Sequence, residues 1–426
     1  MKKSRLKLFA LALIGMILIM GNSAFAAEEL YFRQVNNIDT TINSHTDINT
    51  SDSIHVEDGD CPGYLFLNSR TLVYADESGV EIWRKELSSS NRNNADFLVD
   101  QDDEGNYYAV YTTSTESSGH GHGSSSNGTS GKLKLCDGSD EDMPVADVGG
   151  VQILKIGSEN DDGEMEYSYM VVKSSRLYSL RVEDMSIRTR HGQKYTSLTD
   201  EVAMASDGTY VHIMLESGSV LVYDQYRKQI EGIDSDFLSV FDTTYVGVHS
   251  VKRIFLDDGQ LLISNYNVYA IDEGASSDER TSVILEATYD EETMTRKTYQ
   301  NGTIVGDYII FGTVTDTYDE AGENIISSIV GAEVYKKSDF SLYQTIDDLE
   351  PTDTMAIIKG FTATVGNDGF IIKWSSLNNT TMHMTEYRLK ADSVNPATAD
   401  GLVGYAVGVL VLGGTAAASA SILKRR

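Results

Sequence analysis

The chain has 426 residues, of which 41% are hydrophobic, and a formal net charge of -30 at pH 7. This length and apolar content are enough to fill one large hydrophobic core or two ordinary ones. So large a negative charge repels nucleic acid and anionic lipid surfaces, and the composition therefore argues against a nucleic-acid-binding protein.

Residues 1–26 have the layout of a secretory signal peptide. Basic residues precede an uncharged apolar run, and the small residues Ala24 and Ala26 lie just before Ala27. The apolar run is shorter than the ~20 residues that a membrane-spanning helix needs. We therefore expect export, with cleavage between Ala26 and Ala27. A retained membrane helix is the alternative.

A polar segment follows the predicted signal peptide, and the first of two cysteines comes shortly after it. We expect residues 27–58 to form the leader, which can donate a strand that closes the following domain. Cys61 and Cys136 are the only cysteines. Because an exported chain meets oxidising conditions, they permit a single disulfide, with two reduced thiols as the alternative.

A turn pattern recurs seven times between residues 59 and 391. In each copy a turn dipeptide with glycine is followed at once by a β-rich run, roughly every 50 residues. A tight hairpin turn needs a positive φ, which glycine adopts at low cost, so we expect a positive φ at each of these glycines. They are Gly63, Gly105, Gly163, Gly208, Gly259, Gly306 and Gly369.

Each turn is followed by a strand, a short polar turn and a second strand. The pattern is clearest around Ser174-Ser175 and around Ser217-Gly218, where alternating strands flank the turn. With the strand that precedes each glycine, such as residues 251–256, the unit becomes a four-stranded blade. Blades of this length predict an all-β fold, a β-propeller of seven four-stranded blades over residues 59–391. A stack of hairpins or a two-sheet sandwich is the alternative.

One stretch resembles a known repeat. "ADESGVEIWRKEL" places Gly79, Trp83 and Leu87 in the order found in quinoprotein-like propellers. The resemblance implies that Trp83 packs between neighbouring blades and does not bind a ligand. The related Trp-Asp repeats do not match, because the sequence has no Trp-Asp dipeptide.

Two stretches of the sequence contain several potential metal ligands. Asp100, Asp102 and Glu104 have the order that begins a calcium-binding loop, but the bidentate acid that ends such a loop is missing. His120 and His122 lie in a loop rich in glycine and serine, without neighbouring ligands of fixed position. We therefore predict solvated turns here, and no metal site, cofactor or catalytic residue.

The C-terminal tail carries a five-residue motif, an uncharged segment at 401–423 and a basic end at 424–426. This order resembles the cell-wall sorting signals of Gram-positive surface proteins, whose motif is Leu-Pro-x-Thr-Gly. The motif here, in the linker 392–400, is Asn395, Pro396, Ala397, Thr398 and Ala399. The resemblance implies that a sortase-type transpeptidase cleaves after Thr398 and joins the chain to peptidoglycan. A plain single-pass membrane anchor is the alternative.

Together these features predict a binding or adhesion protein on the extracellular face, anchored to the cell wall or membrane by its C-terminus. The predicted partner in binding is an unidentified extracellular ligand. An extracellular enzyme acting on a glycan or peptide, and a structural scaffold, remain the alternatives.

Overall fold

The structure is a computed structural model. It describes residues 30–41, 53–57, 59–68, 71–87, 94–114, 128–159, 163–173, 175–198, 201–215, 220–233, 254–257, 260–271, 281–377 and 381–391. The predicted signal peptide, sorting motif and C-terminal apolar segment lie outside these ranges. Within them, no helix has both the length and the apolar character needed to cross a membrane.

The chain divides into two compact units, Gln34–Arg388 and a unit made of both ends, Met1–Arg33 and Leu389–Arg426. The described part of the second unit is limited to the strand residues 30–33 and 389–391. In it, the Arg33 guanidinium lies 5.5 Å from the centre of the Tyr31 ring. The larger unit, Gln34–Arg388, contains most of the strands.

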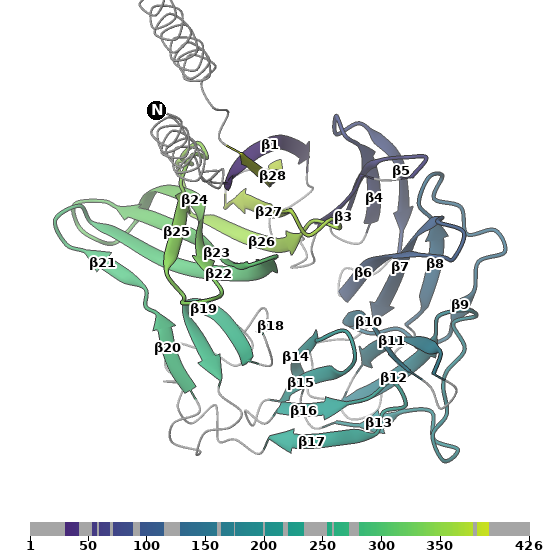
Figure 1. Ribbon diagram of the computed structural model, residues 1–426. Coiled ribbons are helices and arrows are strands. Elements are labelled where there is room, and N and C mark those ends of the chain that lie inside the picture. Colours follow the sequence, from purple (N-terminus) through teal and green to yellow (C-terminus); the bar gives the residue numbers. More distant parts are fainter. Residues whose placement is uncertain are drawn as a thin grey trace, which may run out of the picture. The chain divides into compact units, whose positions relative to one another are not determined.

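Antiparallel sheets make up this unit, and they are arranged radially (Figure 1). The first blade contains β2 (Ser53–Val56), β3 (Gly63–Asn68), β4 (Thr71–Asp76) and β5 (Glu81–Glu86). The second contains β6 (Asn94–Gln101), β7 (Tyr107–Ser114), β8 (Ser130–Lys134) and β9 (Val145–Ala146). The third contains β10 (Gln152–Glu159), β11 (Met165–Lys173), β12 (Arg176–Arg181) and β13 (Thr196–Ser197). The fourth contains β14 (Glu201–Ser206), β15 (Val211–Leu215), β16 (Val220–Tyr223) and β17 (Gln229–Ile233).

An 8-stranded sheet follows and contains two further blades. The fifth blade is β18 (Ile254–Asp257), β19 (Gln260–Ile271) and β20 (Thr281–Leu285). The sixth is β22 (Thr295–Val305), β23 (Tyr308–Tyr318), β24 (Ile325–Lys336) and β25 (Leu342–Ile346), with the short β21 (Thr288–Asp290) paired to β22. The two blades merge where Asn265 and Tyr266 of β19 pair with Gln300 and Tyr299 of β22.

The seventh blade brings the two ends of the domain together. It contains β26 (Ala356–Ala363), β27 (Gly369–Ser376), β28 (Thr381–Ala391) and β1 (Leu30–Thr41), in the order β1-β28-β27-β26. Asn37 Oδ1 accepts a hydrogen bond of 2.8 Å from Thr385 Oγ1, and Asp39 Oδ1 lies 2.7 Å from His383 Nδ1. An N-terminal strand is thus hydrogen-bonded to the last strand of the chain's final sheet.

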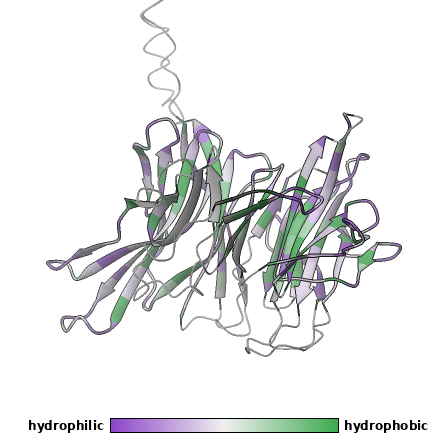
Figure 2. Ribbon diagram, turned by 90° about the horizontal axis from the view of Figure 1, so that it is seen from below, coloured by the Kyte–Doolittle hydropathy of each residue, from purple (hydrophilic) through white to green (hydrophobic). Residues whose placement is uncertain are grey.

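The first strands of successive blades contact one another around the centre. β6 contacts β10, which contacts β14, and the series continues through β18, β22 and β26 to β2. Counted in this way, the described residues form seven blades, and the fold is the predicted all-β propeller. Hydrophobic residues concentrate along the strands and hydrophilic ones at the projecting turns (Figure 2).

Packing between blades supplies much of the core. Between the first two blades, Trp83 is 9% exposed and its Nε1 donates a 2.6 Å hydrogen bond to the Leu135 carbonyl. Gly138, at φ 68°, lies so close that a Cβ there would be 2.7 Å from the Trp83 ring. Trp83 therefore packs between blades, as the resemblance implies.

The recurring glycines fall into two structural classes. Gly63 and Gly369 begin β3 and β27 and have no positive φ, so the prediction was wrong for them. A Cβ at these positions would lie 2.2 Å and 2.3 Å from the carbonyl oxygens of Ala75 and Tyr387, so close strand approach requires glycine here. Gly259 is outside the described residues. The four glycines with the predicted positive φ are Gly105, Gly163, Gly208 and Gly306.

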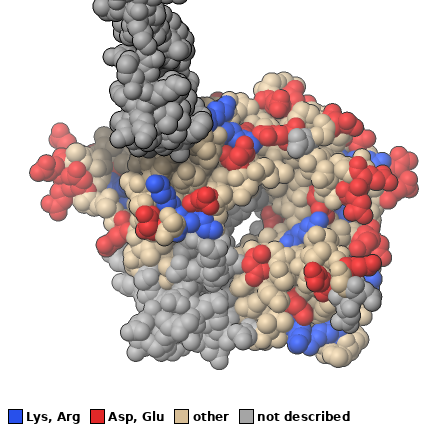
Figure 3. All heavy atoms as spheres, in the orientation of Figure 1, with Lys and Arg blue, Asp and Glu red and all other residues tan. Residues whose placement is uncertain are grey.

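Many acidic residues serve the turns. Asp76 Oδ1 accepts hydrogen bonds of 2.9 Å from the backbone N–H groups of Ser78 and Val80. Asp224 does the same for Tyr226 and Lys228, at 2.9 and 2.7 Å. Such contacts replace a backbone partner within a turn. On the face in Figure 3, acidic side chains gather toward the outer edge of the propeller.

Candidate functional site

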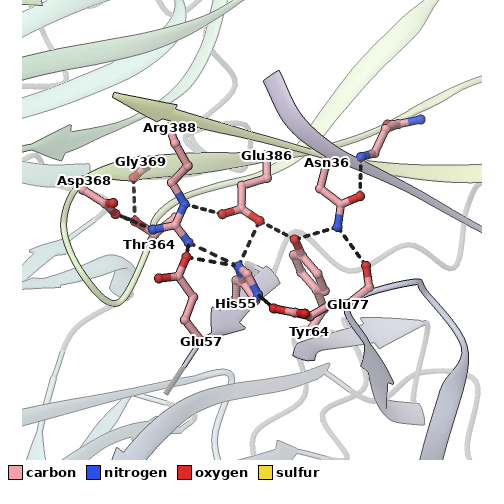
Figure 4. A network of polar contacts seen from close by, with 11 residues as sticks. Asn36, His55, Glu57, Tyr64, Glu77, Thr364, Asp368, Gly369, Glu386 and Arg388 are labelled. Atoms are coloured by element: carbon pink, nitrogen blue, oxygen red, sulfur yellow. Dashed lines mark hydrogen bonds and ion pairs between the residues drawn. The ribbon is translucent and has the colours of Figure 1, made fainter. Parts of the chain in front are cut away.

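A buried polar cluster joins the first and seventh blades, and we call it the closure cluster (Figure 4). β2 and its end supply His55 and Glu57, β3 supplies Tyr64, and alternate positions of β28 supply Glu386 and Arg388. Alternation along a strand places Glu386 and Arg388 on the same face of the sheet. The turns after β4 and β26 add Glu77 and Asp368.

Glu386 is the acceptor at the centre of the cluster. Its side chain is 2% exposed and its Oε2 lies 2.9 Å from His55 Nδ1. Tyr64 Oη also donates to Oε2, and Arg388 Nε donates to Oε1. Arg388, 7% exposed, extends the network by ion pairs with Asp368 and Glu57.

The hydrogen bonds change the titration of these groups. Burial raises the pKa of Glu386, but the hydrogen bonds from His55 and Tyr64 and the charge of Arg388 outweigh it, so the pKa lies below its usual value. Burial, followed by the hydrogen bond to Glu386, raises the pKa of the Tyr64 phenol well above its usual range. At neutral pH the centre is therefore an ionised carboxylate bonded to a neutral phenol.

Similar tyrosine–carboxylate contacts join other blades. Tyr169 Oη of the third blade donates to Asp100 of the second, which also pairs with Lys155. Tyr387 Oη of the seventh blade donates a 2.7 Å hydrogen bond to Asp348, which follows the sixth. The closure cluster is the most elaborate of these contacts, since it adds a histidine and an arginine.

Within the sixth blade, Glu333 accepts hydrogen bonds from Tyr299 Oη at 2.9 Å and Tyr335 Oη at 2.6 Å, and pairs with Lys297. Burial raises the pKa of Glu333, but the hydrogen bonds from Lys297 and the tyrosines outweigh it and hold the pKa below its usual value. Since the folded-state pKa is depressed, this group stabilises the fold above the unfolded-state pKa near 4.5 and loses that contribution as the pH falls.

We therefore expect Glu333→Gln to lower the free energy of unfolding by roughly 1.5–3 kcal/mol at pH 7, because charged hydrogen bonds are lost. The variant should lose less additional stability than the wild type between pH 5 and pH 3. Urea unfolding at several pH values measures both effects. Glu320→Gln, an exposed acid of the same blade, is the control. Equal pH dependence of the wild type and Glu333→Gln would contradict this role.

A second candidate feature is a set of exposed side chains around the start of β11, Met165, Tyr167 and Tyr226, which we call the aromatic patch. Their exposed fractions are 52%, 40% and 41%. Met165 and Tyr167 lie on one face of β11, and Tyr226 contacts Glu166 on the other face. Tyr226 Oη donates to Glu166, which lies between the other two residues in the chain. Lys155 Nζ lies 4.6 Å from the Tyr167 ring centre. The Arg188 guanidinium lies 5.6 Å from the centre of the Tyr226 ring. It also donates a 2.6 Å hydrogen bond to Glu166.

The residues singled out in the sequence are dispersed. Cys61 and Cys136 form a disulfide with a Cα–Cα distance of 5.4 Å, joining the first blade to the second. Asp102 accepts from the side chain and N–H of Asn106 and from Tyr108 Oη, and its pKa falls to about 2. Its carboxylate thus serves its own turn. Other residues that the sequence singled out lie outside the described ranges: Ala24, Ala26, Ala27, His120, His122, Asn395, Pro396, Ala397, Thr398 and Ala399.

Sequence reasoning missed the closure cluster. His55 lay in the expected leader, and Tyr64 and Glu386 are 322 residues apart in the chain. The available signal was the alternation of Glu386 and Arg388 in a strand that also contains Met382, Met384 and Tyr387. This alternation indicates a buried ion pair only when the packing of the seventh blade against the first is known.

No family model and no curated protein matches the chain. Solved structures similar to it include BamB from Moraxella catarrhalis, with 12% identity, a TM-score of 0.43, and coverage of 84% of this chain and 100% of that one. The C-terminal WD40 domain of Sif2 has 11% identity and a TM-score of 0.44, covering 84% of this chain and 99% of that one. By its sheet topology the chain is a β-propeller protein.

Proposed function

We propose that this chain is a surface-displayed propeller that binds an extracellular protein through the aromatic patch, and that its C-terminus anchors it to the cell wall. The exposure of Met165, Tyr167 and Tyr226 is the observation that carries the binding function. Tyrosine, methionine and arginine are enriched at protein interfaces, and a few such residues provide most of the binding energy.

The contacts of the aromatic patch favour recognition because they fix its rings without burying them. Lys155 and Arg188 lie over the two rings, and both cations are paired with carboxylates. A side chain that is already ordered loses less conformational entropy on binding. The aromatic patch therefore presents apolar surface that can be buried in a complex with little loss of conformational entropy.

The binding function can be tested by probing an array of extracellular proteins with the full chain. Tyr167→Ala and Tyr226→Ala should each reduce binding to the captured protein by about 10-fold or more, as expected for residues at the centre of an interface. Tyr289→Ala is the matched control, since Tyr289 is 51% exposed on the sixth blade. Unchanged binding by both patch variants, or an equal loss in Tyr289→Ala, would refute the assignment.

The proposed anchorage rests on the order of the tail. A short segment connects Arg388, the last residue of the propeller unit, to Thr398. Extended chain covers about 3.3–3.6 Å per residue, so the attachment point lies within about 35 Å of the end of the propeller unit. A sortase-type transpeptidase would join Thr398 to peptidoglycan and release the apolar segment.

Mass spectrometry of cell-wall digests tests this anchorage. We expect a C-terminal peptide that ends at Thr398 and carries a peptidoglycan fragment. Thr398→Ala should move the chain from the wall fraction to the membrane or the medium. Recovery of wild-type chain with Lys424, Arg425 and Arg426 intact in the membrane fraction would contradict wall attachment and favour a retained anchor.

A further inference from the structure

His55 of the closure cluster has two ring nitrogens in different environments. Nδ1 lies 2.9 Å from Glu386 Oε2 and 3.2 Å from Arg388 Nη2. A carboxylate can only accept, so the shorter of the two contacts, the one with Glu386, requires a proton on Nδ1, and we assign this tautomer from that distance. Arg388 Nη2 also forms an ion pair with Glu57. Nε2 is then the nitrogen with the free lone pair.

That lone pair has no hydrogen-bond partner within the part of the chain that the structure describes. His55 is only 6% exposed, so Nε2 is a buried atom, without a partner among the described residues, beside the exposed Glu77 side chain. The nearest charged atom is Glu77 Oε1, at 3.8 Å. This separation is too long for a hydrogen bond, but two ligands of one zinc ion, at about 2.0–2.2 Å each, span nearly that distance.

The surrounding charge also favours a cation. The cluster has four carboxylates but a single guanidinium, that of Arg388, which pairs with Glu57, Asp368 and Glu386 and leaves the Glu77 carboxylate beside Nε2. Arg388 lies on the Nδ1 side of the ring and does not block Nε2. Glu77 is 61% exposed, so an ion can reach this side from solvent and its carboxylate can move toward the ion.

We propose that His55 Nε2 and the Glu77 carboxylate bind a divalent ion of the zinc type, with water completing its coordination. Imidazole nitrogen and carboxylate oxygen are both common zinc ligands. Glu386 acts as a positioning residue, because the carboxylate that accepts from Nδ1–H fixes the ring and its tautomer, an arrangement typical of metal-binding histidines.

The ion would join two elements of the first blade at the place where β1 contacts that blade. His55 lies on β2, and the turn that carries Glu77 is held by β1, since Asn36 Nδ2 donates a 2.9 Å hydrogen bond to the Glu77 carbonyl. Asn36 also donates a 3.0 Å hydrogen bond to Tyr64 Oη. Binding to the folded chain alone raises its stability, so the midpoint of thermal unfolding should rise with zinc concentration.

The test is calorimetric titration of the full chain, purified in detergent and stripped with a chelator, with zinc chloride. We expect a binding event that Glu77→Gln weakens by about 10-fold or more, together with loss of the zinc-dependent rise in unfolding temperature. Glu86→Gln, an exposed acid of the same blade, should behave like the wild type. Because Glu77 is exposed, its variant does not endanger folding.

Three results would overturn the proposal. The first is an identical zinc titration for the wild type and Glu77→Gln, which would place any bound zinc elsewhere. The second is loss of binding in Glu57→Gln with Glu77→Gln unaffected, which would put the ion on the Nδ1 side. The third is the absence of any zinc-dependent change in unfolding temperature.

Discussion

Replacement of Arg388 by methionine is expected to lower the free energy of unfolding by about 3–5 kcal/mol, because it leaves a buried carboxylate without its cation. Glu386 is 2% exposed and pairs with Arg388 Nε. Methionine keeps much of the side-chain length, so the loss reports charge more than packing. Chemical denaturation at neutral pH measures it.

A double variant provides the control for this effect. Glu386→Gln combined with Arg388→Met removes both charges and should recover part of the stability, since a neutral pair costs less to bury than a lone charge. If Arg388→Met alone proved as stable as the wild type, the closure cluster would not hold the first and seventh blades together.

The second large effect is expected from loss of the disulfide. Cys61 and Cys136 are 75 residues apart in the chain, and a loop of that length corresponds to about 4 kcal/mol in the chain-entropy model. We expect the Cys61→Ser, Cys136→Ser variant to unfold at a correspondingly lower denaturant concentration. The cross-link constrains the unfolded chain, so the same loss should follow reduction of the wild type.

A thiol reductant thus serves as the matched control. It should destabilise the wild type and leave the double serine variant unchanged. Equal unfolding midpoints for the oxidised wild type and the variant would contradict a stabilising role for this cross-link.

The fold was predictable because its signals are local. Turn glycines such as Gly105 and Gly208 need a positive φ that few other residues adopt, and the alternating strands on either side of Ser175 are observed as β11 and β12. Gly63 shows the limit of this reasoning. Its requirement for glycine comes from the Ala75 carbonyl on the neighbouring strand, a contact that no local pattern encodes.

The closure cluster could not be predicted for the same reason. Its members come from the two ends of the domain. In the sequence alone, each of them has a more common interpretation than membership of a buried cluster. Glu386 is one of 64 acidic residues, many of which serve turns. Glu386 reaches His55 and Tyr64 because the seventh blade, which contains β28, packs against β2 of the first blade.

The position of β28 between β27 and β1 also determines how the domain would carry mechanical load. A pull on the chain beyond Arg388 runs along β28, which pairs with β27 from Met382 to Arg388. When the opposing force acts at the far end of the sheet, the antiparallel strands must slide past each other, and the hydrogen bonds between them share the force. β28, which carries Glu386 and Arg388 of the closure cluster, would then also resist a force applied to the chain beyond its end.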